Sequence, residues 1–253
     1  MKQRALSVYA ALALAFLYAP LLILIVFSFN GGRFTLWEGF SLRWYRAAMN
    51  DPQLAGGLVN SLIVAAGATV LSTAIGTFAA YGLWRKASRL LSGTLYLSLV
   101  TPEIVTGVSL LALFQWAFRF LHLQLGLYTV VIAHVAFSIA YVAIVISARL
   151  RNHDRALEEA AMDLGASEWH AFSRVTLPLL APAIAAAGLL ALVVSFDDYV
   201  ITSLVAGVDS ETLPMVIYAM ARRGVSPVLN AVSALIVVAF GGIILVSQRL
   251  QER

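Results

Sequence analysis

Three acidic residues, Glu103, Asp197 and Asp198, lie inside long hydrophobic segments of this sequence. A charged side chain at bilayer depth costs at least a few kcal/mol, so such residues usually face a cavity, a partner or a substrate path. Carboxylates along a path attract cations and repel anions. We therefore interpret Glu103, Asp197 and Asp198, with the neighbouring Tyr199, as candidate residues that line or gate a transmembrane pathway.

The two adjacent aspartates also admit a structural interpretation. Successive helical residues point about 100° apart, so at most one of them can face a central path squarely while the helix stays regular. In an unbroken helix Asp197 lies about 25 Å beyond Pro178, in the outer part of the membrane. Alternatively, Asp197 and Asp198 cap a helix break or pair with Arg222 or Arg223.

Glu103 and His134 are the remaining polar groups of interest inside hydrophobic runs. Glu103 follows Pro102, and a proline bends a membrane helix and frees a backbone carbonyl. A buried hydrogen-bond role for Glu103 is therefore as compatible with the sequence as a path-lining one. For His134, which has no ligand partner three or four residues away, we expect a structural role.

The elements that must position these residues are membrane helices. The chain has 253 residues, of which 61% are hydrophobic and 12% charged, whereas a soluble domain carries about 25% charge. It has no cysteine, which excludes disulfides and thiolate chemistry. The net charge of +4 comes without a basic patch interleaved with aromatics, so nucleic-acid binding is not expected.

Six segments are long enough to cross a bilayer core of about 30 Å, which takes about 20 helical residues. An all-α bundle of six spans in one domain, residues 1–253, is therefore expected. The predicted spans are Val8–Phe29, Leu58–Leu83, Leu90–Phe118, Leu125–Ala148, Leu179 to about Val208, and Val228–Val246.

Lysine and arginine set the orientation, because short loops rich in them stay in the cytoplasm. Eleven of the 17 basic residues fall on the side that holds both termini and the segment 149–178, so that side is predicted to be cytoplasmic. On the other side, Trp37, Trp44 and Tyr45 are expected at the membrane interface. The alternative is that this outer loop receives an external partner protein.

The cytoplasmic loop at about 149–178 has the pattern of two short helices. Asp154 can cap the first, and Gly165 stands where a helix C-terminal cap prefers glycine. Ser167 can cap the second, with Glu168 in its first turn. Pro178 then fits an early position of the fifth span, where its missing N–H costs little.

The first of these helices carries an apolar stripe and three acids. The stripe consists of Leu157, Ala160, Ala161 and Leu164, and the acids are Glu158, Glu159 and Asp163. An amphipathic helix can lie on a lipid surface, but acids disfavour a surface that is usually anionic. The pattern therefore predicts a docking surface for a protein.

The same loop resembles a known motif. Glu159, Ala160 and Ala161, then Gly165, then Val175-x-Leu177-Pro178 are similar to the EAA loop of ABC importer permeases, Glu-Ala-Ala-x3-Gly-x9-Ile-x-Leu-Pro. Val175 stands where isoleucine is usual. The resemblance implies a type I ABC importer transmembrane domain. It also implies that Asp163, Leu164 and the motif residues form a coupling helix that docks on an ATPase subunit.

Further segments resemble the putrescine/spermidine permeases of this class. They are residues 101–111, Ser195–Tyr199, residues 212–215, residues 16–20 and residues 28–30. This resemblance implies a second homologous permease subunit, two cytoplasmic ABC ATPase subunits and a periplasmic or extracellular solute-binding protein. It places the chain in a bacterial inner membrane.

The chain has no Gly-x4-Gly-Lys-Ser/Thr loop for phosphates. We therefore expect it to bind no cofactor and to be no enzyme, with ATP and Mg²⁺ held by the partner ATPases. The alternatives are an importer permease for another amino-bearing or anionic solute, and a secondary carrier that uses Glu103, His134 and the aspartates as a proton relay. An intramembrane enzyme is disfavoured, because no paired-histidine metal motif or Gly-x-Ser-x-Gly elbow is present.

Overall fold

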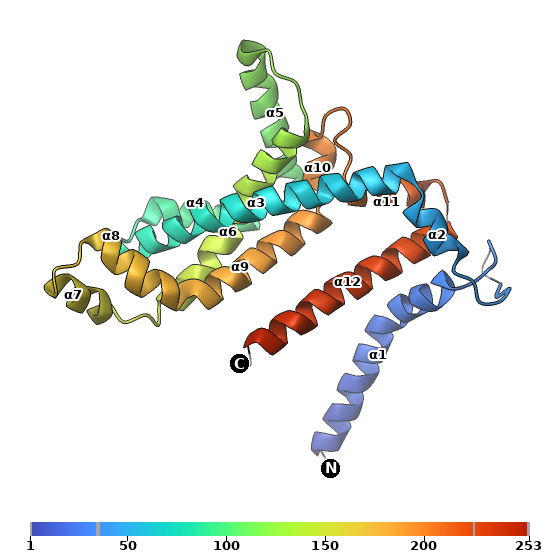
Figure 1. The fold of residues 1–253 in the computed structure, drawn as a ribbon, viewed down its shortest axis with the longest axis horizontal. Coiled ribbons are helices and arrows are strands. Elements are labelled where there is room, and N and C mark those ends of the chain that lie inside the picture. Colours follow the sequence, from blue (N-terminus) through green and yellow to red (C-terminus); the bar gives the residue numbers. More distant parts are fainter. Residues whose placement is uncertain (1, 34–35, 225, 252–253) are drawn as a thin grey trace. The chain divides into compact units, whose positions relative to one another are not determined.

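The computed structural model describes residues 2–33, 36–224 and 226–251. Apart from one isolated β-bridge between Asn30 and Phe40, its regular elements are all helical (Figure 1). In chain order these are α1 (Lys2–Ser28), α2 (Arg43–Met49), α3 (Pro52–Arg85), α4 (Arg89–Val100), α5 (Glu103–Leu121), α6 (Leu127–Leu150), α7 (Ala156–Asp163), α8 (Glu168–Ala171), the π-helical turn η1 (Phe172–Thr176), α9 (Leu177–Asp197), α10 (Val200–Val205), α11 (Leu213–Arg222) and α12 (Pro227–Gln251).

Two compact units make up the chain, Met1–Ala55 with Val216–Arg253, and Gly56–Met215. In the first unit α12 packs against both α1 and α2. Two side chains of α2 hold the end of α1 and the start of the loop that follows it: Trp44 Nε1 donates to the Asn30 carbonyl at 2.9 Å, and the Tyr45 hydroxyl lies 2.6 Å from Ser28 Oγ. Two of the three aromatic residues predicted at the membrane interface therefore stabilise this loop, while Trp37 is exposed.

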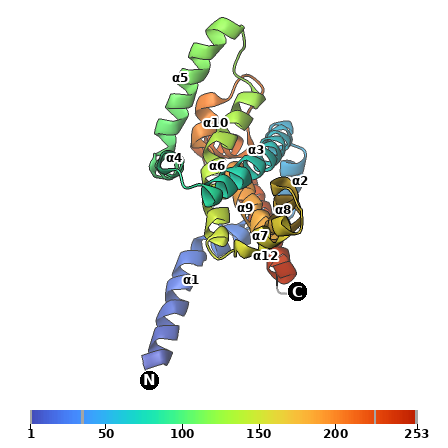
Figure 2. The ribbon, with the colours of Figure 1, turned by 90° about the vertical axis from the view of Figure 1, so that its left-hand side faces the viewer.

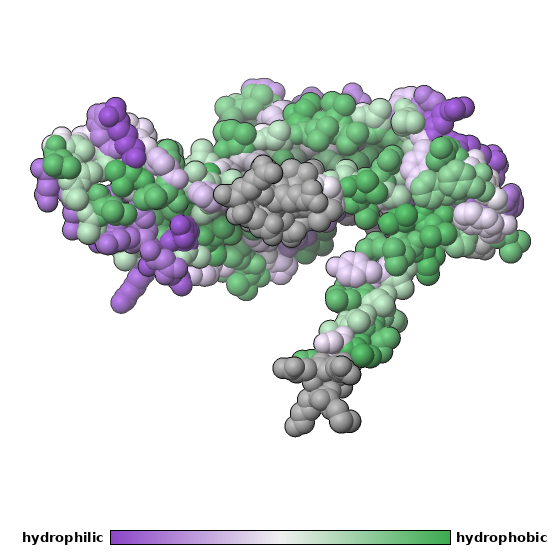
Figure 3. Space-filling model, turned by 60° about the horizontal axis from the view of Figure 1, so that its bottom comes forward, coloured by the Kyte–Doolittle hydropathy of each residue, from purple (hydrophilic) through white to green (hydrophobic). Residues whose placement is uncertain are grey.

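In the second unit α6 is the central helix. It packs against α4, α9 and α10, and it contains more buried residues than the other long helices. Figure 2 shows α6 between α4 and α9. Hydrophobic side chains cover much of the face that Figure 3 presents, and hydrophilic ones gather at its two ends, one of which holds α7 and α8. This distribution suits helices in lipid with polar ends.

Within the part of the chain that the structure describes, five helices are long and apolar enough to cross a membrane: Leu6–Ser28, Pro52–Arg85, Glu103–Leu121, Leu127–Leu150 and Glu168–Asp197. The sixth predicted span corresponds to α12. The prediction of an all-α polytopic bundle is confirmed, and the count of six spans is approximate.

The predicted single span Leu90–Phe118 is wrong. Its residues form two helices, α4 and α5, because Thr101 and Pro102 both have extended backbone conformations between them. A residue before proline is driven out of the helical region by the proline ring, and proline itself has no N–H to donate. The proline was expected to bend one helix, and instead the helix ends at Val100 and a new one begins at Glu103.

The start of the fifth span also differs from the prediction. Ser167 caps the second cytoplasmic helix as expected, because its Oγ accepts from His170 N at 3.3 Å. The helix does not stop before Pro178, however, and runs from Glu168 to Asp197 through the π turn. A proline ring crowds the carbonyl four residues earlier. The wider π turn relieves that crowding, with Leu177 N donating to the Phe172 carbonyl.

Close approach of α5 and α10 depends on a glycine. A Cβ added to Gly107 would lie 2.6 Å from Leu204 Cδ1 and 3.4 Å from Ile201 Cα. Glycine therefore lets α5 and α10 pack together, and both helices begin directly after a helix break.

Candidate functional site

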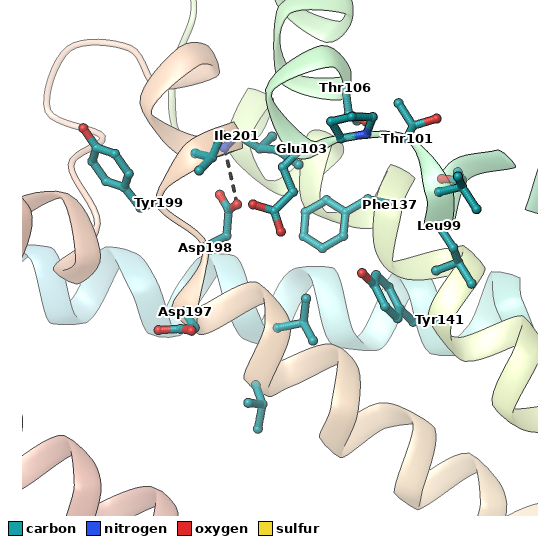
Figure 4. A pocket seen from close by; sticks show the side chains of 16 residues that line it. Leu99, Thr101, Glu103, Thr106, Phe137, Tyr141, Asp197, Asp198, Tyr199 and Ile201 are labelled. Carbon is teal, nitrogen blue, oxygen red and sulfur yellow. Dashed lines mark hydrogen bonds between the residues drawn. The ribbon is translucent and has the colours of Figure 1, made fainter. Parts of the chain in front are cut away.

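A cavity of about 570 Å³ opens where the two helix breaks meet α6. Its walls come from the α4–α5 link, the middle of α6 and the α9–α10 link (Figure 4). The lining includes all four predicted pathway residues: Glu103, Asp197, Asp198 and Tyr199. The structure thus brings together residues that lie almost a hundred positions apart.

Aromatic rings stand beside these carboxylates. Phe137 and Tyr141 of α6 line the cavity together with Tyr199. In Figure 4 the Glu103 and Asp198 carboxylates point into the same space beside Phe137, and Asp197 points away from them. Glu103 and Asp197 are exposed, whereas the Asp198 side chain is only 5% exposed. Two of the three acids are therefore available to a solute.

Asp198 caps helix α10. Its Oδ2 accepts from Thr202 N and from Thr202 Oγ1, each at 2.8 Å, and its Oδ1 accepts from Ile201 N at 3.3 Å. A carboxylate at a helix N-terminus is also favoured by the helix dipole. Of the interpretations of the aspartate pair, a cap at a helix break is confirmed for Asp198.

His134 supports this cap from α6. Its side chain is fully buried, with Nδ1 2.7 Å from Ser195 Oγ and Nε2 2.9 Å from Thr202 Oγ1. Nε2 also lies 3.3 Å from Asp198 Oδ2. Since the single hydroxyl proton of Thr202 goes to Asp198, Nε2 must carry a proton to face both oxygens. The expected structural role of His134 is confirmed, but its link to a candidate pathway acid had no signal in the sequence.

The cytoplasmic loop forms a second candidate site. Gly165 ends α7 with φ of +92°, as its predicted capping role requires. Gly165 N donates to the Met162 carbonyl at 2.9 Å and Ala166 N to the Ala161 carbonyl at 3.0 Å, which are the two bonds of a Schellman cap. At the other end of α7, Asp154 Oδ1 accepts from Ala156 N at 3.0 Å.

Most of the predicted docking residues are exposed. They are Glu159, Ala160, Asp163, Leu164 and Gly165 on α7 and its cap, and Pro178 in α9, while Ala161 and Leu177 are half-buried. Leu164 is 90% exposed and Leu157 is 47% exposed. This chain leaves the predicted apolar stripe largely uncovered.

Glu158 differs from the other two acids of α7. Its side chain is only 2% exposed, whereas Glu159 and Asp163 are exposed. The reason is tertiary: α7 packs beside the end of α3, where Tyr81 and Arg85 bind the Glu158 carboxylate. No spacing rule within the loop distinguishes Glu158 from Glu159.

Known proteins resemble the chain in sequence over most of its length. The putrescine transport system permease protein PotI of Escherichia coli K12 is 42% identical over 237 residues, which cover 91% of this chain and 84% of that protein. The spermidine/putrescine transport system permease protein PotC of the same organism is 38% identical, over 92% of this chain and 89% of that protein. PotC of Haemophilus influenzae is 37% identical, over 94% of this chain and 93% of that protein.

Solved structures share the fold at lower identity. A bacterial ABC transporter that imports alginate has a TM-score of 0.69 at 17% identity, covering 100% of this chain and 97% of that chain. An amino acid ABC transporter solved with histidines has a TM-score of 0.59 at 20% identity, covering 81% and 98%. Residues 72–253 match the family model described as binding-protein-dependent transport system inner membrane component. The chain belongs to this family, the transmembrane permease subunits of ABC importers.

Proposed function

We propose that this permease forms half of the translocation pathway of an ATP-driven polyamine importer, and that putrescine or spermidine passes through the cavity at the helix breaks. The observation that carries this proposal is the gathering of Glu103 and Asp197 with three aromatic rings in one cavity. The relatives described as putrescine and spermidine permeases support the same substrate class.

The chemistry of the cavity matches a polyamine. Such a molecule carries ammonium groups separated by short methylene chains. Carboxylates form charge-assisted hydrogen bonds with ammonium groups, and aromatic faces attract cations within about 6 Å. Glu103 and Asp197 serve as the charged partners, with Tyr199 at their side. Phe137 and Tyr141 provide surfaces for the methylene groups.

One continuous helix connects this cavity to the cytoplasmic loop. It runs over the 30 residues Glu168–Asp197, and at 1.5 Å per residue it is about 45 Å long. Its first turns adjoin α7, and its last residue lines the cavity. A displacement of the loop by an ATPase subunit therefore reaches Asp197 along a helix, and access to the cavity changes with it.

The complete importer in this proposal has four further subunits. Two cytoplasmic ATPases bind ATP and Mg²⁺ and dock on α7 through Glu159, Ala160, Ala161, Asp163, Leu164 and Gly165, next to Leu177 and Pro178. A second permease completes the pathway, and a periplasmic or extracellular solute-binding protein delivers the cargo. A related alginate ABC transporter was solved in complex with a pentasaccharide-bound periplasmic protein. The whole chain acts as one permease domain in the bacterial inner membrane, with both termini in the cytoplasm, and hydrolyses no ATP.

Uptake by the reconstituted importer tests the substrate. Proteoliposomes that contain all subunits and internal ATP are expected to accumulate labelled putrescine or spermidine. Glu103→Gln and Asp197→Asn should each reduce that uptake about tenfold or more, because each removes a charge partner of the ammonium groups.

The matched control is Asp209→Asn, an exposed acid outside the cavity at a positive φ that asparagine tolerates. Its uptake should equal that of the unsubstituted importer. Accumulation of an anionic solute in place of polyamines, or full polyamine uptake by both cavity variants, would contradict the proposal.

A further inference from the structure

Glu158 is a buried acid next to an exposed one, and its carboxylate has three donors. Oε2 accepts from the Tyr81 hydroxyl and from Arg85 Nη1, both at 3.2 Å. Oε1 accepts from the Thr176 hydroxyl. Acidic side chains are almost never fully buried unless they are paired in this way. The three donors come from α3 and from the π turn that leads into α9, so Glu158 joins three helical elements.

Contacts around Glu158 strengthen the junction between α3 and the loop. Arg85 Nη2 lies 3.0 Å from Glu168 Oε1, in the first turn of α8. Arg155 donates from Nη2 to the Arg85 carbonyl at 3.1 Å and places its guanidinium 5.0 Å from the Trp84 ring centre. The last turn of α3 is thus bound to the segments on both sides of Glu158.

Ring packing extends the junction to the π turn. The Phe172 and Tyr81 ring centres lie 4.4 Å apart. Phe172 begins the π turn and Thr176 ends it, and both are buried. The π turn therefore contacts α3 through the Phe172 ring and Glu158 through the Thr176 hydroxyl.

We propose that Glu158 is a positioning residue of the transport cycle, which binds α3 to the docking loop so that α7, α3 and the start of α9 move as one body. The inference rests on the proposed docking of α7 on an ATPase subunit. Adjacent acids then have separate roles: Glu159 faces the ATPase, and Glu158 passes the displacement to α3. Without Glu158, a displacement of the loop still moves α9, because the two are covalently continuous. It no longer moves α3.

Two spin labels measure whether α3 and α7 move together. The chain has no native cysteine that would compete for the labels. Labels are attached in the complete importer at Lys86→Cys, directly after α3, and at Ala156→Cys in α7, two exposed positions. Electron paramagnetic resonance should give one label–label distance that stays the same when ATP binds. With Glu158→Gln added, the distance should broaden and change with ATP. An ATP-dependent distance without Glu158→Gln, or an unchanged distance with it, would overturn the inference.

Transport per ATP hydrolysed provides the second readout. With Glu158→Gln the ATPase subunits should still co-purify and hydrolyse ATP, while uptake per ATP falls about tenfold. Tyr81→Phe, which removes one of the three donors, should give a smaller loss in the same direction. It serves as the test variant if Glu158→Gln does not accumulate in the membrane. Asp209→Asn is the control for the change from acid to amide.

A double variant separates a specific link from general damage. If Glu158 acts through Arg85, then Glu158→Gln with Arg85→Gln should lose less uptake per ATP than the product of the two single losses. Independent losses would contradict the link. Failure of ATPase subunits to co-purify with the unsubstituted chain would refute the proposed function itself, whereas normal coupling by Glu158→Gln in an intact complex would refute only this inference.

Discussion

His134 Nε2 lies 3.3 Å from Asp198 Oδ2 and connects the first half of α6 to the break between α9 and α10. The cavity acid Asp198 is therefore held by the protein on both sides, by its cap bonds to α10 and by a buried histidine. Asp197, one residue earlier, is exposed at the cavity. The two neighbouring acids therefore differ: Asp198 fixes the shape of the site, and Asp197 is available to cargo.

Removal of His134 should destabilise the permease. His134→Ala removes one partner of the buried Asp198 carboxylate and takes the histidine partner from the Ser195 hydroxyl, and a buried unsatisfied polar group costs about 1–3 kcal/mol. We expect a lower midpoint temperature of thermal unfolding for the purified importer. Because both residues act through one network, His134→Ala with Asp198→Asn should cost less than the sum of the single changes. Strict additivity would argue against the network.

Asp197→Asn and Asp198→Asn should have different effects on the stability of the permease. Asp197 is exposed, so its amide variant should keep the unfolding temperature, since surface substitutions usually change stability by less than about 0.5 kcal/mol. Its polyamine uptake should still fall. Asp198→Asn should lower the unfolding temperature, because Asp198 accepts from Ile201 through Oδ1 and from Thr202 through Oδ2, and an amide keeps only one of these two acceptor oxygens. Equal stability losses for both variants would contradict the assignment.

Gly165 should be required for coupling rather than for membrane insertion. Its φ of +92° is unfavourable for any side chain, and a left-handed residue other than glycine costs roughly 1–2 kcal/mol. Gly165→Val is therefore expected to abolish transport through loss of the α7 cap while membrane levels stay normal. Gly82→Ala is a control, because a Cβ at Gly82 meets nothing within 4 Å and the position is helical. Normal uptake with Gly165→Val would count heavily against the docking role of α7.

Enlarging Gly107 should separate α5 from α10 and distort the cavity. Overpacking of a filled site costs about 1–3 kcal/mol, and Gly107→Val places two further carbons beyond a Cβ that already meets Leu204 at 2.6 Å. Uptake should fall and unfolding should occur at a lower temperature. Gly107→Ala should cause a smaller loss through the same contact with Leu204, and Leu204→Ala added to Gly107→Ala should restore the room and much of the uptake. No rescue by this pair would show that the contact with Leu204 does not limit the site.

The sequence by itself determined the features that depend on neighbouring residues. Apolar length indicated most of the spans, Gly165 and Ser167 ended and began helices where their local geometry allows it, and the spacing of the loop residues indicated the permease class. These features arise within one helical turn or within one span. Local chemistry therefore suffices to predict them.

Only the tertiary structure decided which acids are buried and which are available. His134 meets Ser195 and Thr202 across 61 and 68 residues, and Tyr81 meets Glu158 across 77. Glu103 and Asp197 line one cavity because α5 and α9 converge on α6. Burial of a carboxylate is set by donors that another helix brings to it, and the spacing of residues within one segment carries no information about those donors.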